Sequence, residues 1–296
     1  MSGTLGATLD PDRRSRRWPG VGATRRYPLL AVGLVVALAI VALGLLAPWI
    51  APYPADAGSA TDPSAVLLPP SQAHLFGTDQ VGRDVFTRVL YGARTSLAIT
   101  VFVLVVAATI GLAVGLTAGF FGGKADAILM RVTDVFLAFP ALLLAVALAA
   151  VLTASAFNAA VAIAATWWPW YARLARAQAA SIRHQGYSDA ARVIGASRTR
   201  QVVRHVLPNA ATPVFVQMSL DGAGIILTAA TLSYLGLGAQ DPTPEWGLMV
   251  SQGQSLATTA WWVVTFPGLA ILLTAAAFNF IGDGLQTALD PKRGGR

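Results

Sequence analysis

The residues that could do chemistry in this 296-residue chain do not form a catalytic pattern. Its three histidines, His74, His184 and His205, are scattered along the sequence, and it has no cysteine for thiolate chemistry. The stretch 122–125, Gly-Gly-Lys-Ala, lacks the spacing and the hydroxyl of a phosphate-binding loop, and no G-x-S-x-G elbow is present. We therefore expect no enzymatic activity, no catalytic residue, and no metal or cofactor bound by this chain.

A charged, polar segment at residues 187–209 separates two apolar runs of the chain. The carboxylate of Asp189 favours the positive N-terminal end of a helix. Ala190 and Ala191 are small enough for close approach by another surface, and Gly195 can end or bend the helix. These features predict a folded docking element for a soluble partner rather than a slack loop.

The same segment ends in Leu207-Pro208, directly before the next apolar run. Because proline interrupts helices, we expect Pro208 to stop the basic helix before it and to form a hinge back into the membrane. An ordinary inner loop made basic by membrane topology would explain the arginines. It would not explain the alanine pair, the glycine and the Leu-Pro sequence together.

The composition identifies the class of protein to which these residues belong. Hydrophobic residues make up 55% of the chain, charged residues only 12%, and the mean hydropathy is +0.60. A soluble domain carries about 25% charged residues, so the sequence predicts a protein that crosses the membrane several times. The net charge of +7 lies beside apolar runs, which membrane orientation explains without a nucleic-acid partner.

The apolar runs predict an all-α integral membrane protein with six transmembrane helices, because a lipid-exposed backbone must satisfy its own hydrogen bonds. The expected spans are 29–50, 95–121, 127–152, 156–175, 211–235 and 261–285. The first span is too long for the apolar core of a signal peptide, so we expect it to be retained. The expected division is a basic tail (1–28), a first helix (29–51), an outer segment (52–94), a core domain (95–285) and a second tail (286–296). The core domain includes a coupling loop (176–208) and an external loop (236–260).

Basic residues fix the expected orientation. With both termini in the cytoplasm, the inner segments hold nearly all arginines and lysines, and the outer segments keep only Arg83, Arg88 and Arg94. The positive-inside rule then places the segment around Asp189 in the cytoplasm.

The outer segments carry two further expectations. Residues 76–94 show near-helical spacing of apolar residues, which predicts an amphipathic helix at the membrane interface with Asp79, Arg83 and Asp84 facing outward. The stretch 236–260 contains prolines and is flanked by tryptophans, which predicts an external loop or a short re-entrant piece.

Inside the expected spans, Asp221 is the ionisable residue with the most direct functional interpretation, because charged groups there are costly and often functional. It either lines the translocation path or is a packing residue at a partner interface. Gly111, Gly115 and Gly119 recur every fourth residue, a pattern suited to close helix packing rather than to a substrate path.

The pattern Asp189-Ala190-Ala191, Gly195 and Leu207-Pro208 resembles the "EAA…G…LP" loop of ABC importer permeases, with Asp189 where glutamate is usual. The likeness extends to the peptide and nickel branch of that family, and the order and length resemble its second, C-type, transmembrane subunit. The other matching stretches are 74–84, 91–94, 137–140, 170–173, 235–238, 242–247, Asn279, 282–284 and 289–291.

The resemblance implies the type I ABC importer permease fold, a place in the prokaryotic plasma (inner) membrane, and a function in di- or oligopeptide import. It implies that Asp189, Ala190, Ala191, Gly195, Leu207 and Pro208 form a coupling helix and its return to the membrane. The implied partners are a homologous permease, two cytoplasmic ATPase subunits that bind ATP and magnesium, and an extracytoplasmic peptide-binding protein. Import of nickel, glutathione or another small solute remains an alternative, as do a self-sufficient channel or secondary transporter and a membrane-embedded enzyme.

Overall fold

The computed structural model describes residues 28–183 and 197–289, and these residues form helices, turns and one isolated β-bridge between Thr78 and Asp84. The α-helices are α2 (Pro28–Ile50), α3 (Val85–Phe121), α4 (Gly123–Leu137), α5 (Ala141–Val151), α6 (Ala156–Arg183), α8 (Arg198–Gln201), α9 (Leu207–Tyr234), α10 (Trp246–Gly253) and α11 (Trp262–Leu289). Short 3-10 helices η1 (Pro54–Ala57), η2 (Pro63–Ala65) and η4 (Gln254–Leu256) and a π-helical turn η3 (Val202–Val206) complete the set. The expected all-α class is confirmed.

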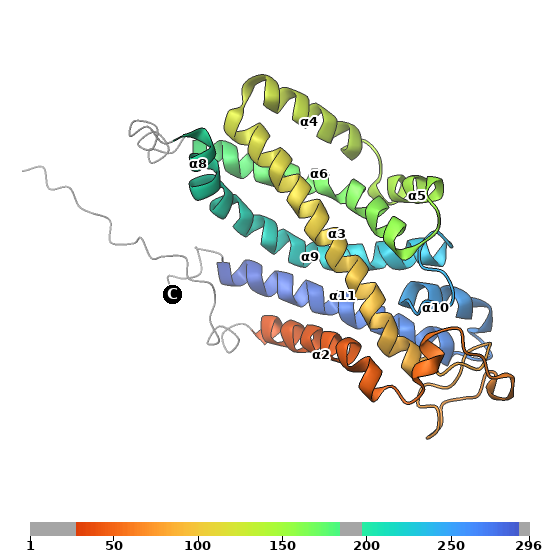
Figure 1. Cartoon of the computed structure of the whole chain (residues 1–296). Helices are drawn as coiled ribbons and strands as arrows, with labels where there is room; N and C mark the ends of the chain where they lie inside the picture. The colour runs from red at the N-terminus through yellow and green to blue at the C-terminus, as the bar shows by residue number, and fades with distance from the viewer. Residues whose placement is uncertain (1–27, 184–196, 290–296) are drawn as a thin grey trace, which may run out of the picture.

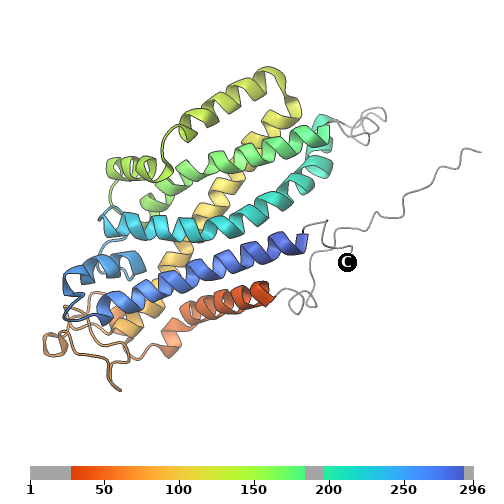
Figure 2. The ribbon, with the colours of Figure 1, turned by 180° about the vertical axis from the view of Figure 1, so that it is seen from behind.

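The long helices form a bundle in which α2, α11, α9 and α6 lie side by side in that order, and α3 crosses all four (Figures 1 and 2). The segment between α2 and α3 and helix α10 gather at one end of the bundle, while α8 lies at the opposite end (Figure 1). The N-terminal end of α2 and the C-terminal end of α11 lie at the same end of the bundle as α8 (Figure 1). The fold therefore separates two groups of polar residues, one at each end.

Among the described residues, four helices are long and apolar enough to span a membrane: α2, α3, α9 and α11. The expected span 127–152 is not continuous, because α4 and α5 meet at a break with an 86° bend and count together as a fifth candidate. The break falls at Pro140, which has no amide hydrogen to donate to a helix and disfavours helical geometry at Phe139. Helix α6 is 28 residues long and extends eight residues beyond the expected end of its span.

Helix α3 corrects the interpretation of the outer segment. It runs for 37 residues, about 55 Å, and therefore includes residues 85–94 in the same helix as the expected span 95–121. Asp84 begins it as the N-cap, because its carboxylate accepts a hydrogen bond from the amide of Thr87 at 2.7 Å. A separate interfacial helix is therefore not formed. The expectation of outward-facing Asp79, Arg83 and Asp84 is wrong, because all three are buried.

The expected glycine face is confirmed as the contact between α3 and α6. A Cβ atom placed on Gly111, Gly115 or Gly119 would collide with atoms of α6, among them the backbone oxygens of Ala172 and Arg176. Small residues allow two helix backbones to approach closely, and this contact buries Tyr171, Ala172 and Ala175 of α6 completely. The α3–α6 contact thus forms the centre of the bundle.

Candidate functional site

The expected docking residues Asp189, Ala190, Ala191 and Gly195 lie outside the described residues, whereas Leu207 and Pro208 begin α9. The prediction that Pro208 stops the preceding helix is wrong, because α8, η3 and α9 follow one another without a break. The wider π-helical turn η3, Val202–Val206, ends two residues before Pro208. A π-turn shifts the hydrogen-bonding register, which accommodates the missing amide and the ring of a proline.

The start of α9 is packed firmly into the bundle. Val206 and Ala210 are buried against Leu116 and Phe120 of α3 and against Ala179 of α6. The stretch 184–196 therefore joins two helices, α6 and α8–α9, that are held in contact by an apolar cluster. A force applied to that stretch would act directly on both helices.

Three arginines lie on one face of the C-terminal half of α6. From the sequence alone, we explained them by membrane topology. Arg176 makes two hydrogen bonds to the carboxylate of Asp126 on α4, at 2.9 and 2.6 Å. Arg173 bonds Asp134, also on α4, at 2.6 Å, and Arg183 donates to the backbone oxygen of Phe121 at 3.3 Å. Their spacing of three and seven residues fits one helix face, a signal that sequence reasoning did not use.

Asp221 lies half-buried in the middle of α9 and touches residues of two helices. Gln217, one turn earlier, donates a hydrogen bond from its side-chain amide to Oδ1 of Asp221 at 3.0 Å. The carboxyl group also lies against the side chains of Tyr171 and Trp167 of α6. Asp221 therefore joins α9 to α6.

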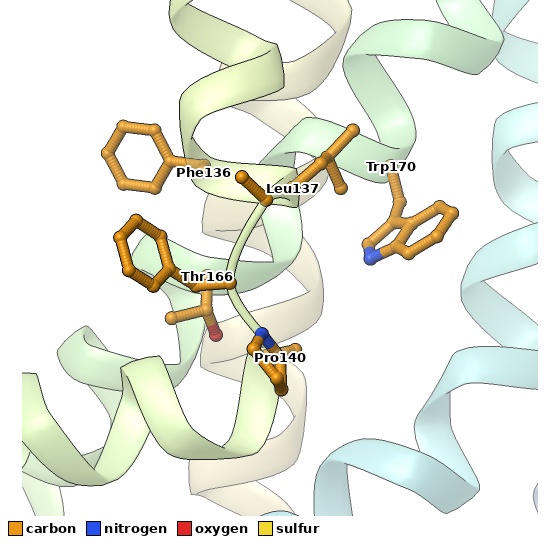
Figure 3. Close-up of a pocket in the computed structure, with 8 residues that line it drawn as sticks. Phe136, Leu137, Pro140, Thr166 and Trp170 are labelled. Carbon is orange, nitrogen blue, oxygen red and sulfur yellow. The ribbon is translucent and has the colours of Figure 1, made fainter.

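A pocket of about 340 Å³ opens where α4 and α5 meet, against α6 (Figure 3). The chain around Pro140 forms one wall, and Thr166 and Trp170 of α6 project toward it from the other side (Figure 3). The sequence predicted one span over 127–152, in which Pro140 would kink or start a helix, but it did not predict this pocket. Pro140 was the available signal.

The opposite end of the bundle holds a network of buried charges that connects the two outer segments. Asp79 accepts a hydrogen bond from Nε of Arg83 at 2.8 Å and lies 3.7 Å from Nε of Arg88. Asp241, between α9 and α10, bonds Nη1 of Arg83 at 3.0 Å and lies 3.9 Å from Nη2 of Arg88. The network thus ties the segment before α3 to the segment after α9.

The network shifts the pKa values of Arg83 and Asp241, both of which lie outside the helices. Burial alone would lower the pKa of Arg83, but the hydrogen bonds and charges of Asp79 and Asp241 raise it above its usual range. Partial burial would raise the pKa of Asp241, yet hydrogen bonds from Arg83 and Gln252 and the charge of Arg83 hold that pKa below its usual range. Both groups are therefore charged in the neutral pH range.

The external loop 236–260 is more ordered than expected, because it contains the helix α10. Glu245 is the N-cap and accepts hydrogen bonds from the amides of Gly247 and Leu248 at 3.0 and 2.9 Å. Its carboxylate also accepts a bond from the hydroxyl of Ser96 on α3 at 3.0 Å. Trp246 and Trp262 are buried in the fold rather than placed at the membrane interface, whereas Trp261 is exposed.

Within 28–183 and 197–289, no group of three or more histidine, cysteine or carboxylate side chains could hold a metal ion. The geometry instead provides two polar ends, a broken helix with a pocket, and few ionisable groups between them. Such an arrangement can bind partners at both ends and change shape between them.

Comparisons with known proteins agree with this arrangement. Residues 111–295 match the family described as binding-protein-dependent transport system inner membrane component. Residues 24–70 match the N-terminal TM domain of oligopeptide transport permease C.

Similar proteins cover nearly the whole chain. The probable D,D-dipeptide transport system permease protein DdpC of Escherichia coli K12 is 47% identical over 269 residues, which is 91% of this chain and 89% of that protein. The dipeptide transport system permease protein DppC of the same organism is 49% identical over 268 residues, 88% of each chain. A DppC protein of Alkalihalophilus pseudofirmus is 42% identical over 90% of this chain and 87% of that protein.

The expected resemblance to ABC importer permeases of the C type is thus confirmed. The matched family is the membrane component of such systems and not their ATPase, and its members depend on a binding protein. This chain therefore belongs to the family of binding-protein-dependent transport system inner membrane components and is a multi-pass permease subunit of the inner membrane.

Proposed function

We propose that this chain is the C-type permease subunit of an ATP-driven importer of di- and oligopeptides. We infer the peptide cargo from the similarity to dipeptide permeases over about nine-tenths of the chain. The chain pairs with a homologous permease to frame one path, and two cytoplasmic ATPase subunits bind ATP and magnesium. An extracytoplasmic binding protein delivers the peptide.

Six membrane crossings are part of this proposal: α2, α3, the broken pair α4–α5, α6, α9 and α11. Helix α6, at about 42 Å, is long enough to cross although its second half carries arginines. An even number of crossings is supported by the start of α2 and the end of α11, which lie at the same end of the bundle as α8 (Figure 1). The positive-inside rule makes that end cytoplasmic.

Coupling takes place at the loop 176–208, which ends in Leu207 and Pro208. The residues Asp189, Ala190, Ala191 and Gly195 form the helix that docks on the ATPase, and closure of the ATPases moves it. The loop connects the end of α6 to the start of α9, and these two parts pack against each other. Motion of the loop therefore reaches both helices. Nucleotide must bind one conformation better than the other for this to drive transport.

Asp221 is proposed to line the path, where its carboxylate can face the ammonium group of a peptide. Its place in the middle of the membrane-spanning helix α9 supports this role. Its contacts with Gln217 and Tyr171 equally suit a packing residue, and an Asp221→Asn variant separates the two by reducing peptide uptake without lowering the yield of folded complex.

Replacing Gly195 with tryptophan tests the coupling proposal. We expect peptide uptake to fall to background, because a large side chain prevents the close approach to the ATPase, while capture of peptide by the binding protein stays unchanged. The measurements are uptake of a labelled dipeptide in cells and peptide binding by the isolated binding protein. Uptake at the parental rate in the Gly195→Trp variant would refute the coupling role.

The matched control is Gly236→Trp, at a glycine on the opposite end of the bundle. No atom lies within 4 Å of a Cβ placed there, although the φ angle of +78° adds backbone strain. This variant should retain coupling between ATP hydrolysis and uptake.

Nickel or glutathione cargo is tested by the same uptake assay with those solutes in place of the dipeptide.

A further inference from the structure

The ion pair between Arg173 of α6 and Asp134 of α4 lies in an unusual place for two charged groups. Asp134 is eleven residues into α4, about 16 Å along the helix, and three residues before the break in the candidate span α4–α5. The hydrocarbon layer of a membrane is only about 30 Å thick. The side chains of Arg173 and Asp134 are nevertheless 53% and 49% exposed on this chain.

Half-exposed charges at such a position cannot face lipid at low cost. Ionisable residues inside membrane spans face the interior of the protein or a water-filled cavity. Helix α2 shows the contrasting pattern, because its exposed residues are all apolar, including Val35 at 66% and Leu38 at 65%. The face of α4 and α6 that carries the ion pair is therefore not a lipid-facing surface.

The backbone beside the ion pair gives a second, independent observation. The break leaves polar groups at the end of α4 and the start of α5 outside regular helix bonding. The amide of Phe139 bonds the oxygen of Phe136, three residues earlier rather than four, at a long 3.4 Å, and Pro140 has no amide hydrogen. Irregular backbone at membrane depth is tolerated where it is covered by protein or lines a water-filled cavity, and here it lines the pocket in Figure 3.

The ion pair lies next to this pocket rather than in its lining, because Asp134 and Arg173 are each three residues from a lining residue, Leu137 and Trp170 respectively. The unused hydrogen-bonding groups of the pair indicate what can bind there. The bond uses Nη2 of Arg173 and Oδ1 of Asp134. In the part of the chain that the structure covers, no other hydrogen bond reaches either side chain, so one carboxylate oxygen and the remaining guanidinium N–H groups stay available. Trp170, 56% exposed, lies one turn from Arg173 and offers an aromatic surface that accepts different side chains.

We propose that the Asp134–Arg173 pair and the pocket at the α4–α5 break form a subsite of the translocation path that receives the charged ends of an unblocked peptide. A short peptide carries an ammonium group and a carboxylate, which match Asp134 and Arg173 respectively. The backbone groups of the break and the ring of Trp170 contact the rest of the peptide without selecting its sequence. This inference rests on the peptide-import function proposed above.

Cysteine accessibility tests the subsite, because the parental chain contains no cysteine. Ala138→Cys places a thiol at the pocket, and Ala39→Cys places one at an exposed position in the apolar helix α2 as the matched control. The complete complex, reconstituted in liposomes, is treated with a charged maleimide in the presence of ATP or a non-hydrolysable analogue. We expect at least tenfold faster labelling of Ala138→Cys than of Ala39→Cys in at least one nucleotide state.

Protection by peptides tests the recognised chemistry. An unblocked dialanine peptide should slow labelling of Ala138→Cys, whereas the same peptide acetylated at one end and amidated at the other should not. Arg173→Gln should abolish the protection, while Arg131→Gln, which removes an exposed arginine from the same region of α4, should preserve it.

Labelling of Ala138→Cys no faster than that of Ala39→Cys would overturn the inference, as would equal protection by the blocked peptide. Uptake of dialanine by the same liposomes is measured in parallel. Normal uptake without protection refutes the subsite and leaves the proposed function standing. Absence of dialanine uptake despite rapid labelling refutes the peptide cargo instead and removes the ligand assigned to the subsite.

Discussion

Replacing Asp79 with alanine should lower the free energy of unfolding of the chain by about 3 to 5 kcal/mol, the loss typical when one partner of a buried ion pair is removed. Asp79 is 5% exposed and faces Arg83 and Arg88, which are 3% and 1% exposed. Both oxygens of Asp79 are engaged, since Oδ1 also accepts bonds from the amides of Val81 and Arg83 at 3.0 and 2.9 Å. Without this carboxylate, the two buried guanidinium groups keep the half-exposed Asp241 as their ion-pair partner among the described residues, and Arg88 keeps its bonds to the backbone oxygens of Asp56 and Pro242.

The measurement is unfolding of the purified chain in mixed detergent and SDS micelles. Asp62→Ala is the matched control, because Asp62 lies in the same outer segment but is exposed and bonds only Ser64 with its side chain. A loss for Asp79→Ala no larger than that for Asp62→Ala would show that the outer charge network does not hold the two segments together.

Replacing Gly115 with leucine should destabilise the chain by about 3 kcal/mol or more, at or above the upper end of the usual cost of overpacking. The first carbon of a side chain at this position would already collide with the backbone oxygen of Ala172 and lie 2.7 Å from Cβ of Ala175. Backbone atoms cannot move aside as a flexible side chain can. The helices α3 and α6 would therefore have to separate along the centre of the bundle.

Ala113→Leu provides the control for this prediction, because Ala113 lies on the same helix two residues earlier and is exposed. The same SDS unfolding measurement on the two variants compares a leucine side chain at a buried position with one at an exposed position of the same helix. Similar stability of both variants would contradict the close packing of α3 on α6.

The helical class, the positions of the long helices and the glycine contact follow from the sequence because they depend on local pattern and on the demands of the membrane. Runs of apolar residues and glycines every fourth position report directly on helices and their contacts. The break in 127–152 was less evident, since a proline in a membrane helix either bends it or is absorbed by it. At Pro208 a π-helical turn absorbs the proline, and at Pro140 the helix breaks.

The buried charges could not be predicted in the same way. Asp79 and Asp241 are 162 positions apart, and only the tertiary fold brings both to Arg83. A polar stretch such as 76–84 looks like a solvated surface until its partners are known, so burial reversed the expected direction of three side chains. The arginines of α6 were likewise explained by topology alone, because their partners Asp126 and Asp134 lie on another helix.

The central claim is that this permease moves peptides only when nucleotide hydrolysis in its partners acts through residues 184–196. Its most direct test is uptake of labelled dialanine into liposomes that contain the complete complex and an excess of binding protein, with ATP inside or outside as the orientation requires. We predict uptake that depends on ATP hydrolysis in the parental complex, and ATP hydrolysis without uptake in the complex carrying Gly195→Trp. Uptake by this chain alone, or uptake that persists with a non-hydrolysable nucleotide, would contradict the claim.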